Sequence, residues 1–150
     1  MTDYVLVHGS WGGGWHWERM RPLLEAPGHR VHTPTLSGLA DRGHLAGAGT
    51  GLTTHIEVIS RYLEWNNLRE VVLVGHSYGG MVITGVAGRV ADRLAHLVYL
   101  DAFRPKPGQA AFDVLPDLPQ LFGAPPPESP WGWPLIDPVP LGVTDPEEIA

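Results

Sequence analysis

Cysteine is absent from this chain of 150 residues, and lysine occurs only once, at Lys106. Without cysteine there can be no disulfide bond, no thiolate metal site and no cysteine nucleophile. The net charge is −6, and no run of lysine and arginine is present. Because nucleic-acid binding needs clustered positive charge to neutralise phosphates, the sequence argues against a nucleic-acid partner.

Long apolar runs are missing too, since no stretch approaches the roughly 18 residues that a membrane span requires. The opening residues, MTDYVLVHGS, carry an acidic side chain where a secretory signal would carry basic ones. These two absences predict a cytoplasmic protein with no membrane partner. The apolar fraction of 43% and the length suit about one domain with one core.

Apolar runs alternate with helical patterns over the first hundred residues. Strands are expected at residues 4–8, 29–34, 70–75 and 94–102. Helices are expected at residues 16–29, 53–67 and 78–93, and the alternative for the first is a start near Pro22 with irregular structure before it. This alternation predicts the α/β class, with a parallel sheet whose apolar strands are covered by helices on both faces.

Two of these helices have a predicted apolar face. In the first, that face is expected to contain Trp17, Met20, Leu23 and Leu24, with Gly28 at the helix end. In the second, with Thr53 or Thr54 as the N-cap, it is expected to contain Ile56, Ile59, Tyr62 and Leu63.

The composition changes after Phe103, because twelve of the fifteen prolines fall within residues 104–150. This segment has no helical or alternating period, yet it contains Trp131 and Trp133, which are unusual in disordered chains. We therefore expect two parts: residues 1–103 as the core, and residues 104–150 as the proline-rich start of a lid. A disordered tail is the alternative.

The sequence GHSYG, residues 75–79, places Ser77 between a predicted strand and a predicted helix. A serine on such a turn is held in strained backbone geometry, which requires glycine two positions before and after it. The turn raises the hydroxyl above the edge of the sheet where open α/β folds bind ligands. The pattern predicts that Ser77 is a nucleophile; the alternative is a tight turn in which Ser77 only caps the helix.

A second motif, HGSWGGGW at residues 8–15, follows the first predicted strand. A glycine-rich loop there can direct backbone N–H groups toward a substrate oxygen, so the N–H groups of Ser10 and Tyr78 are expected to form an oxyanion hole. A phosphate-binding loop is disfavoured because its characteristic lysine is missing. A flexible glycine turn remains the simpler alternative.

Together, the stretches VLVHGSWGGGWHW, LLEAPGHRV, VVLVGHSYGGMVI and VYLDAFRP resemble the N-terminal part of an α/β-hydrolase. The resemblance extends over roughly residues 3–108. It is nearest to the branch of plant methylesterases, salicylate-binding esterases, hydroxynitrile lyases and bacterial esterases. It implies the α/β-hydrolase fold, no metal, no cofactor and a cap over an apolar pocket. By position, Ser77 matches the nucleophile of that family, and Ser10 and Tyr78 match its oxyanion residues.

The catalytic base is missing from the sequence, since this family places its histidine after the acid and no histidine follows His96. Asp101, at the end of the fourth predicted strand, is a candidate acid because some α/β-hydrolases place theirs there. The alternative is an aspartate that only caps a loop. We therefore expect a chain truncated after its fourth predicted strand, with that strand left at an exposed sheet edge.

The predicted function is that of a serine esterase for small apolar or aromatic esters, with Trp11 and His76 contacting the substrate. One alternative is a lyase that cleaves cyanohydrins on the same scaffold, in which Ser10 supplies a hydroxyl. Another is a non-catalytic protein that binds ligands in the same pocket. The expected partner is a small-molecule ester, and a homodimer is left open.

Overall fold

The computed structural model describes residues 1–118 together with residues 120, 123 and 127. The chain divides into two compact units, Met1–Leu115 and Pro116–Ala150, and the helices and strands below belong to the first. Most of the predicted lid, including Trp131 and Trp133, lies outside the described residues. The predicted division between residues 103 and 104 stays a prediction.

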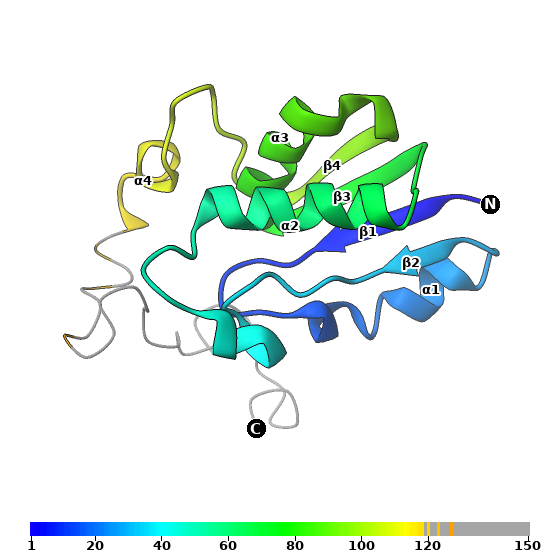
Figure 1. The fold of residues 1–150 in the computed structure, drawn as a ribbon, viewed down its shortest axis with the longest axis horizontal. Coiled ribbons are helices and arrows are strands. Elements are labelled where there is room, and N and C mark those ends of the chain that lie inside the picture. The colour runs from blue at the N-terminus through cyan, green and yellow to red at the C-terminus, as the bar shows by residue number, and fades with distance from the viewer. Residues whose placement is uncertain (119, 121–122, 124–126, 128–150) are drawn as a thin grey trace. The chain divides into compact units, whose positions relative to one another are not determined.

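Strands and helices alternate along the first unit, as Figure 1 shows. The strands are β1 (Asp3–Val7), β2 (Arg30–His32), β3 (Val71–Ser77) and β4 (Leu94–Ala102). The α-helices are α1 (Arg21–Glu25), α2 (Leu52–Trp65), α3 (Gly79–Val90) and α4 (Ala111–Val114). Short 3₁₀ helices are η1 (Gly14–Trp17), η2 (Ala40–Leu45) and η3 (Ala91–Arg93). The predicted α/β class is confirmed.

The four strands form one parallel sheet in the order β2-β1-β3-β4. In the register, Val5 pairs with His32 on one side and with Leu73 on the other. Each connection between successive strands contains at least one helix, as parallel strands require. Since all four strands run the same way, their carboxyl ends meet at one edge, where β1 and β3 lie side by side.

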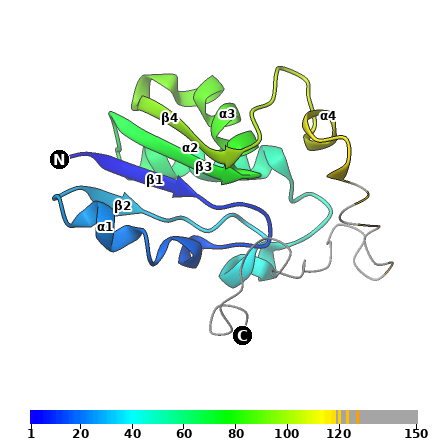
Figure 2. The same ribbon diagram turned by 180° about the vertical axis from the view of Figure 1, so that it is seen from behind.

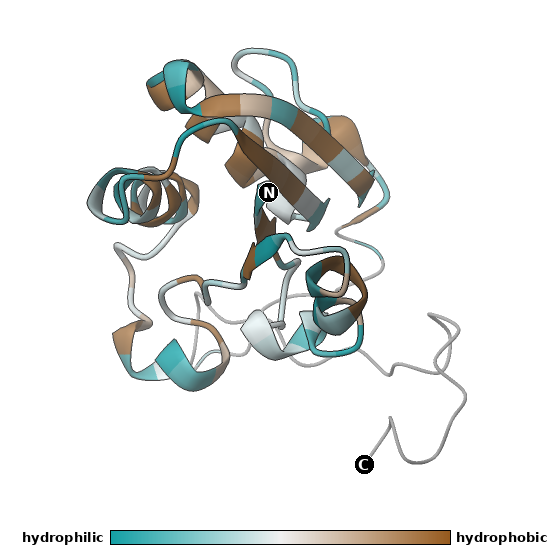
Figure 3. Ribbon diagram, turned by 90° about the vertical axis from the view of Figure 1, so that its right-hand side faces the viewer, coloured by the Kyte–Doolittle hydropathy of each residue, from teal (hydrophilic) through white to brown (hydrophobic). Residues whose placement is uncertain are grey.

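Helices cover the two faces of the sheet unequally. Helices α2 and α3 lie on one face, while α1 packs beside β2 on the other (Figures 1 and 2). Alternate residues of β1 serve these two faces: Val5 and Val7 join the core beneath α2 and α3, and Leu6 packs with Trp17. In Figure 3 the polar side of α2 faces away from the largely apolar strands.

Strand β4 departs from the predicted two-sided burial. It is at the end of the strand order, so the predicted exposed sheet edge is confirmed. Leu97 and Tyr99 pack against the core, but Val98 is 39% exposed and Leu100 is 40% exposed. Helices cover both faces of the sheet, as predicted, but within the described residues α1 packs beside β2, at the opposite edge from β4, so Val98 and Leu100 are left exposed.

The first helix differs most from its prediction. Instead of one helix over residues 16–29, the structure has η1 and then the five-residue α1, which begins one residue before Pro22. Of the predicted apolar face, Met20 and Leu23 are exposed, Leu24 is only partly buried, and Trp17, which lies in η1, is buried. Gly28 adopts a φ of +89° just after the helix, which suits the predicted stop.

The second helix has the predicted apolar face but a different start. Ile59 and Leu63 are fully buried, and Ile56 and Tyr62 pack against the same core. The residue preceding the first turn is Gly51, so the prediction of Thr53 or Thr54 as the N-cap is wrong. The Thr54 hydroxyl donates instead to the carbonyl oxygen of Gly49, at 3.1 Å.

Nowhere in the described part of the chain is a helix long and apolar enough to cross a membrane.

Candidate active site

Ser77 is the last residue of β3 and precedes Tyr78, the N-cap of α3. Its backbone φ is +52°, in the left-handed region that residues other than glycine seldom occupy. Such strain costs about 1–3 kcal/mol and is found mainly where the surrounding structure holds a functional side chain. The structure therefore places Ser77 on the sharp strand-to-helix turn that the motif predicts.

The flanking glycines allow three backbone segments to approach one another. A Cβ atom on Gly75 would lie 2.6 Å from the carbonyl oxygen of Gly79. A Cβ atom on Gly79 would lie 2.6 Å from the carbonyl oxygen of Val7, in β1. Backbone strain was the predicted reason for these glycines, but the left-handed φ belongs to Ser77 itself. The glycines are needed because β1, β3 and α3 pack too closely for side chains.

The glycine-rich loop after β1 lies against this turn. A Cβ atom on Gly9 would lie 2.9 Å from the Cβ atom of Ser77. Ser10 follows directly and is half-buried, and Trp11 has a φ of +58°. Within the described residues, neither the Ser10 N–H nor the Tyr78 N–H donates a hydrogen bond to another residue. The Ser10 N–H lies in the loop that packs against Ser77, and the Tyr78 N–H belongs to the next residue in the chain. Both donors are therefore near Ser77 and unpaired within the described residues.

His8, just before this loop, is fully buried and hydrogen-bonded through both ring nitrogens. Its Nδ1 lies 2.8 Å from the Gly9 carbonyl oxygen, and its Nε2 accepts from the Leu36 N–H at 3.0 Å. Burial lowers the pKa of His8 to about 4, because the charged ring would lose its hydration. His8 is therefore neutral near pH 7 and cannot accept a proton there without disrupting its contact with Leu36.

His76 lies on the other side of the loop. Its Nδ1 is 3.3 Å from the position of a Cβ on Gly9, and its ring meets Trp17 edge-on with centroids 6.4 Å apart. Both Trp11 and His76 are half-buried, so part of each side chain reaches the surface near the turn. Their predicted contact with substrate stays a prediction.

Asp101 is placed at the same edge of the sheet by a β-bulge. His76 pairs with Leu100 and Ser77 pairs with Ala102, so Asp101 is the extra residue between them. Its φ is +42°, also left-handed, and its side chain is exposed. Within the described residues no histidine hydrogen-bonds to Asp101, so its predicted role as the acid stays a prediction.

No described residue supplies the base. All eight histidines of the chain lie within the described residues, and none of them hydrogen-bonds to the Ser77 hydroxyl. In three of them both ring nitrogens are hydrogen-bonded to residues other than Ser77, namely His8, His32 and His55. Nor does the described part of the chain contain three or more histidine or acidic side chains grouped to hold a metal ion.

His55 is the residue that the sequence reasoning missed. It lies in α2, is 7% exposed, and its Nδ1 is 2.9 Å from the hydroxyl of Tyr78. The available signal was its spacing, because His55 precedes Ile59 by four residues and so shares the buried face of α2. A histidine on that face has to find polar partners inside the protein.

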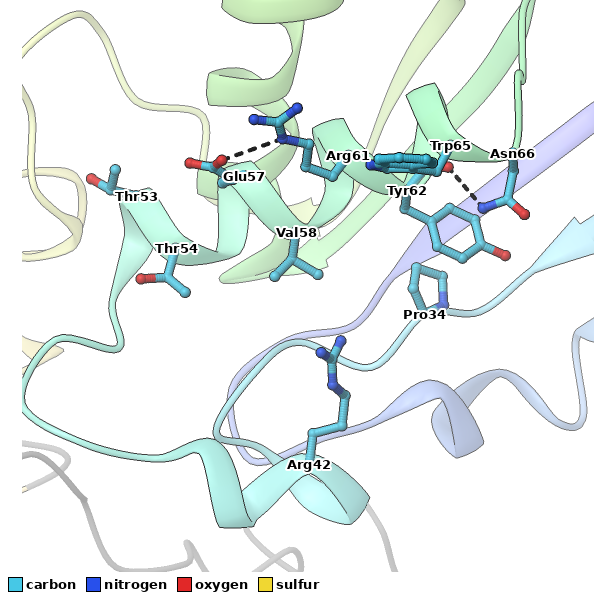
Figure 4. A pocket seen from close by; sticks show the side chains of 10 residues that line it. All are labelled: Pro34, Arg42, Thr53, Thr54, Glu57, Val58, Arg61, Tyr62, Trp65 and Asn66. Atoms are coloured by element: carbon cyan, nitrogen blue, oxygen red, sulfur yellow. Dashed lines mark hydrogen bonds and ion pairs between the residues drawn. The ribbon is translucent and has the colours of Figure 1, made fainter.

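Two grooves in the described part of the chain are lined by residues other than Ser77. One of about 530 Å³ runs along the outer side of α2, where Figure 4 shows Tyr62 and Trp65 above Arg42 and Pro34. The other, of about 350 Å³, lies beside η1 and includes Trp15. Neither is lined by Ser77, Ser10 or Tyr78. The described residues thus form the Ser77 turn and the glycine-rich loop beside it, while neither groove is lined by the predicted site residues.

Comparison with known proteins places this arrangement among enzymes. The model of the alpha/beta hydrolase family matches residues 4–148. The carbendazim hydrolyzing esterase of Nocardioides sp. (strain SG-4G) is 50% identical over 116 residues, which are 77% of this chain and 48% of that protein. Methylesterase 8 of Arabidopsis thaliana is 36% identical over 110 residues, which are 68% of this chain and 38% of that protein.

A solved structure agrees with these sequence relatives. The extracellular alpha/beta-hydrolase from a Paenibacillus species superposes with a TM-score of 0.69 at 30% identity, covering 81% of this chain and 51% of that one. The chain therefore spans about half the length, or less, of the relatives it matches.

Proposed function

This chain belongs to the alpha/beta hydrolase family, and on that premise we propose that the complete protein is a serine esterase. In this proposal the chain supplies the nucleophile Ser77 and the two oxyanion donors, the N–H groups of Ser10 and Tyr78. The observation that carries it is the left-handed φ of Ser77 between β3 and α3, next to two backbone N–H groups that donate no hydrogen bond within the described residues. The relatives whose names describe esterases support it.

The chemistry follows from these positions. The Ser77 oxygen attacks the ester carbonyl carbon as its proton passes to a general base, and the carbonyl oxygen becomes negatively charged. The Ser10 and Tyr78 N–H groups would stabilise that charge, and each such donor typically contributes about 10²- to 10³-fold to the rate. The alcohol then leaves with a proton from the base, and water releases the acyl group from Ser77.

We assign the base to a histidine in the part of the protein that this chain does not span. The assignment is supported by the half-length match to the relatives and by the eight histidines here, none of which contacts the Ser77 hydroxyl. Asp101 is the candidate in this chain for the carboxylate that orients the base. It is the extra residue of the β-bulge opposite His76 and Ser77, and bulges are common next to active sites.

For the substrate we propose small apolar or aromatic esters. Trp11, half-buried in the loop after β1, supplies aromatic surface close to the Ser77 turn, and the half-buried ring of His76 lies against the buried Trp17. The names of the relatives mention carbendazim and methyl esters, which makes carbendazim and an aromatic methyl ester suitable first substrates.

The test uses the protein made from its complete gene, assayed with p-nitrophenyl acetate, carbendazim and an aromatic methyl ester. Ser77→Ala should reduce kcat by about 10⁴-fold or more, because nucleophile loss removes most of a triad's contribution. Ser60→Ala is the matched control: that hydroxyl donates to the Ile56 carbonyl within α2, and its loss should leave kcat unchanged. Ester hydrolysis that survives in Ser77→Ala would refute the proposal.

Two results would redirect the assignment. Cyanide released from mandelonitrile, without ester hydrolysis, would favour the lyase. Tight binding of the same esters without turnover, unaffected by Ser77→Ala, would favour a binding protein that uses the same site.

A further inference from the structure

Tyr78 is held at both ends of the residue. Its carbonyl oxygen accepts a hydrogen bond from the Met81 N–H at 2.9 Å, which fixes the backbone at the start of α3. Its hydroxyl lies 2.9 Å from Nδ1 of His55, and the two rings meet edge-on with centroids 5.7 Å apart. The backbone N–H that we assign to the oxyanion hole therefore belongs to a residue whose side chain has its own anchor.

The directions of these hydrogen bonds follow from the partners. Nε2 of His55 lies 2.8 Å from the carbonyl oxygen of Ser37, and a carbonyl can only accept. Nε2 therefore carries the hydrogen, and in a neutral ring Nδ1 is left as the acceptor for the Tyr78 hydroxyl. Burial lowers the pKa of His55, although the Ser37 carbonyl partly offsets this, and burial raises the pKa of Tyr78. Both groups thus stay neutral near pH 7, and the tyrosine is the donor.

His8 forms a parallel contact on the other side of the site. Nδ1 of His8 contacts the carbonyl oxygen of Gly9, which belongs to the same peptide group as the Ser10 N–H, and Nε2 accepts from the backbone N–H of Leu36. Leu36 and Ser37 are consecutive residues in the loop after β2. Two buried histidines therefore link the segments around Ser77 to the loop after β2: His8 through Leu36, and His55 through Ser37.

We propose that His55 is a positioning residue for the oxyanion hole: by anchoring the Tyr78 side chain to Ser37, it fixes the Tyr78 backbone N–H beside Ser77. His8 does the same for the Gly9–Ser10 peptide. The inference rests on the proposed esterase function and deepens it. Fixed donors matter because an oxyanion hole works by preorganisation, and misplacement by about 1 Å can cost about 10²-fold in rate.

The experiment is a double-mutant cycle on the protein made from its complete gene, with p-nitrophenyl acetate as substrate. His55→Phe removes both hydrogen bonds, and Tyr78→Phe removes the hydroxyl while keeping the backbone donor. Each should lower kcat by roughly 10-fold with KM changed less than about 2-fold, because the donor acts on the transition state. The double variant should be no slower than the slower single variant, since both changes break one connection.

The control is Tyr99→Phe. The Tyr99 hydroxyl makes a comparable hydrogen bond, 2.8 Å from Thr84 Oγ1 on the same helix α3, but this bond includes neither Tyr78 nor its anchor His55. Its loss should leave kcat unchanged. His55→Asn is the conservative variant, because its side-chain oxygen can take the place of Nδ1 as acceptor from Tyr78. It should recover part of the kcat lost in His55→Phe, which a purely structural role would not predict.

An unchanged kcat in Tyr78→Phe, or losses that multiply in the double variant, would overturn the inference. The readout also separates the two proposals. If Ser77→Ala abolishes hydrolysis while Tyr78→Phe does not alter it, only the positioning role fails. If Ser77→Ala leaves hydrolysis intact, the proposed function itself fails. Should His55→Phe not fold, Tyr78→Phe alone still decides the question.

Discussion

The two ends of α2 carry the same chemical arrangement with different consequences. Near its end, Tyr62 reaches Nδ1 of His32 at 3.1 Å, and Nε2 of that ring lies 3.1 Å from the carboxylate of Asp3. Near its start, His55 links the hydroxyl of Tyr78 to the carbonyl of Ser37. Each is an oxygen–histidine–tyrosine chain, and α2 contributes the tyrosine to one and the histidine to the other.

What differs is what lies beyond the tyrosine. At the amino end of the sheet, Asp3 also accepts from Arg30, and the network joins β1, β2 and α2. At the carboxyl end, Tyr78 continues into a backbone N–H with no partner in the described residues, beside the strained Ser77. The same side chains therefore stabilise the fold at one end, and at the other end they support a site whose donors are left unpaired.

The largest effect on stability is expected from adding a side chain at Gly79, where the backbones of β1 and α3 lie close together next to Ser77. Gly79→Ala would place a Cβ 2.6 Å from the carbonyl oxygen of Val7, the last residue of β1, and 2.9 Å from that of the next residue, His8. Because backbone cannot move aside cheaply, we expect the free energy of unfolding to fall by more than about 3 kcal/mol. Urea unfolding measures it.

Gly88→Ala is the matched control for that change. Gly88 is in the same helix α3 and has open space around its Cβ position. Its replacement should stabilise the protein by up to about 1 kcal/mol through helix propensity. Equal effects at the two glycines would show that the approach of β1 to α3 is not tight.

The next effect is a pH dependence from His8. Burial lowers the pKa of His8 from 6.5 to about 4 in the folded protein. Between these values the unfolded chain binds a proton that the folded protein does not, so stability is present above about pH 6.5 and is lost as the pH falls toward 4. A difference of this size corresponds to roughly 3 kcal/mol.

The measurement is urea unfolding at several pH values for the natural protein and for His8→Gln. The variant should show a smaller loss of stability between pH 7.5 and pH 5. His44→Gln, at an exposed histidine of η2, should keep the natural pH dependence. If His8→Gln follows the natural curve, His8 does not stay neutral in the fold.

The smallest effect on stability is expected from the Asp3 network at the amino end of the sheet. Burial raises the pKa of Asp3, but the hydrogen bonds from Arg30 and His32 outweigh it, so the pKa lies below its usual value. Asp3→Asn should lower the free energy of unfolding by about 1–2 kcal/mol at pH 7, since Arg30 is half exposed and screened by water. The contribution is present above pH 3.8, the ordinary value, and is lost as the pH falls through the lower folded pKa.

The difference between Asp3→Asn and the natural protein should therefore shrink when unfolding is measured at pH 3 instead of pH 7. Ester hydrolysis should not change, in contrast to Tyr78→Phe at the other end of α2. A loss of kcat in Asp3→Asn would show that the two networks are not separate in function.

Local features were predicted well from the sequence. The bounds of β4 match the prediction because a mainly apolar run defines the strand. The Ser77 turn was predicted because Gly75 and Gly79 each lie two positions from Ser77 in the sequence. The first predicted helix, residues 16–29, was too long, because the observed α1 has only five residues and starts next to Pro22. Periodicity alone cannot show how few turns of a helix form. The role of His55 depends on α2 lying across Tyr78, a contact between residues 23 positions apart that only packing creates.

The central claim is that Ser77 is a nucleophile, and covalent labelling tests it most directly. The protein from the complete gene would be treated with a fluorophosphonate, digested and analysed by mass spectrometry for the modified peptide. We predict one phosphonylated residue, Ser77, and no modification in Ser77→Ala. Modification of another residue, or ester hydrolysis that continues while Ser77 stays unmodified, would contradict the account.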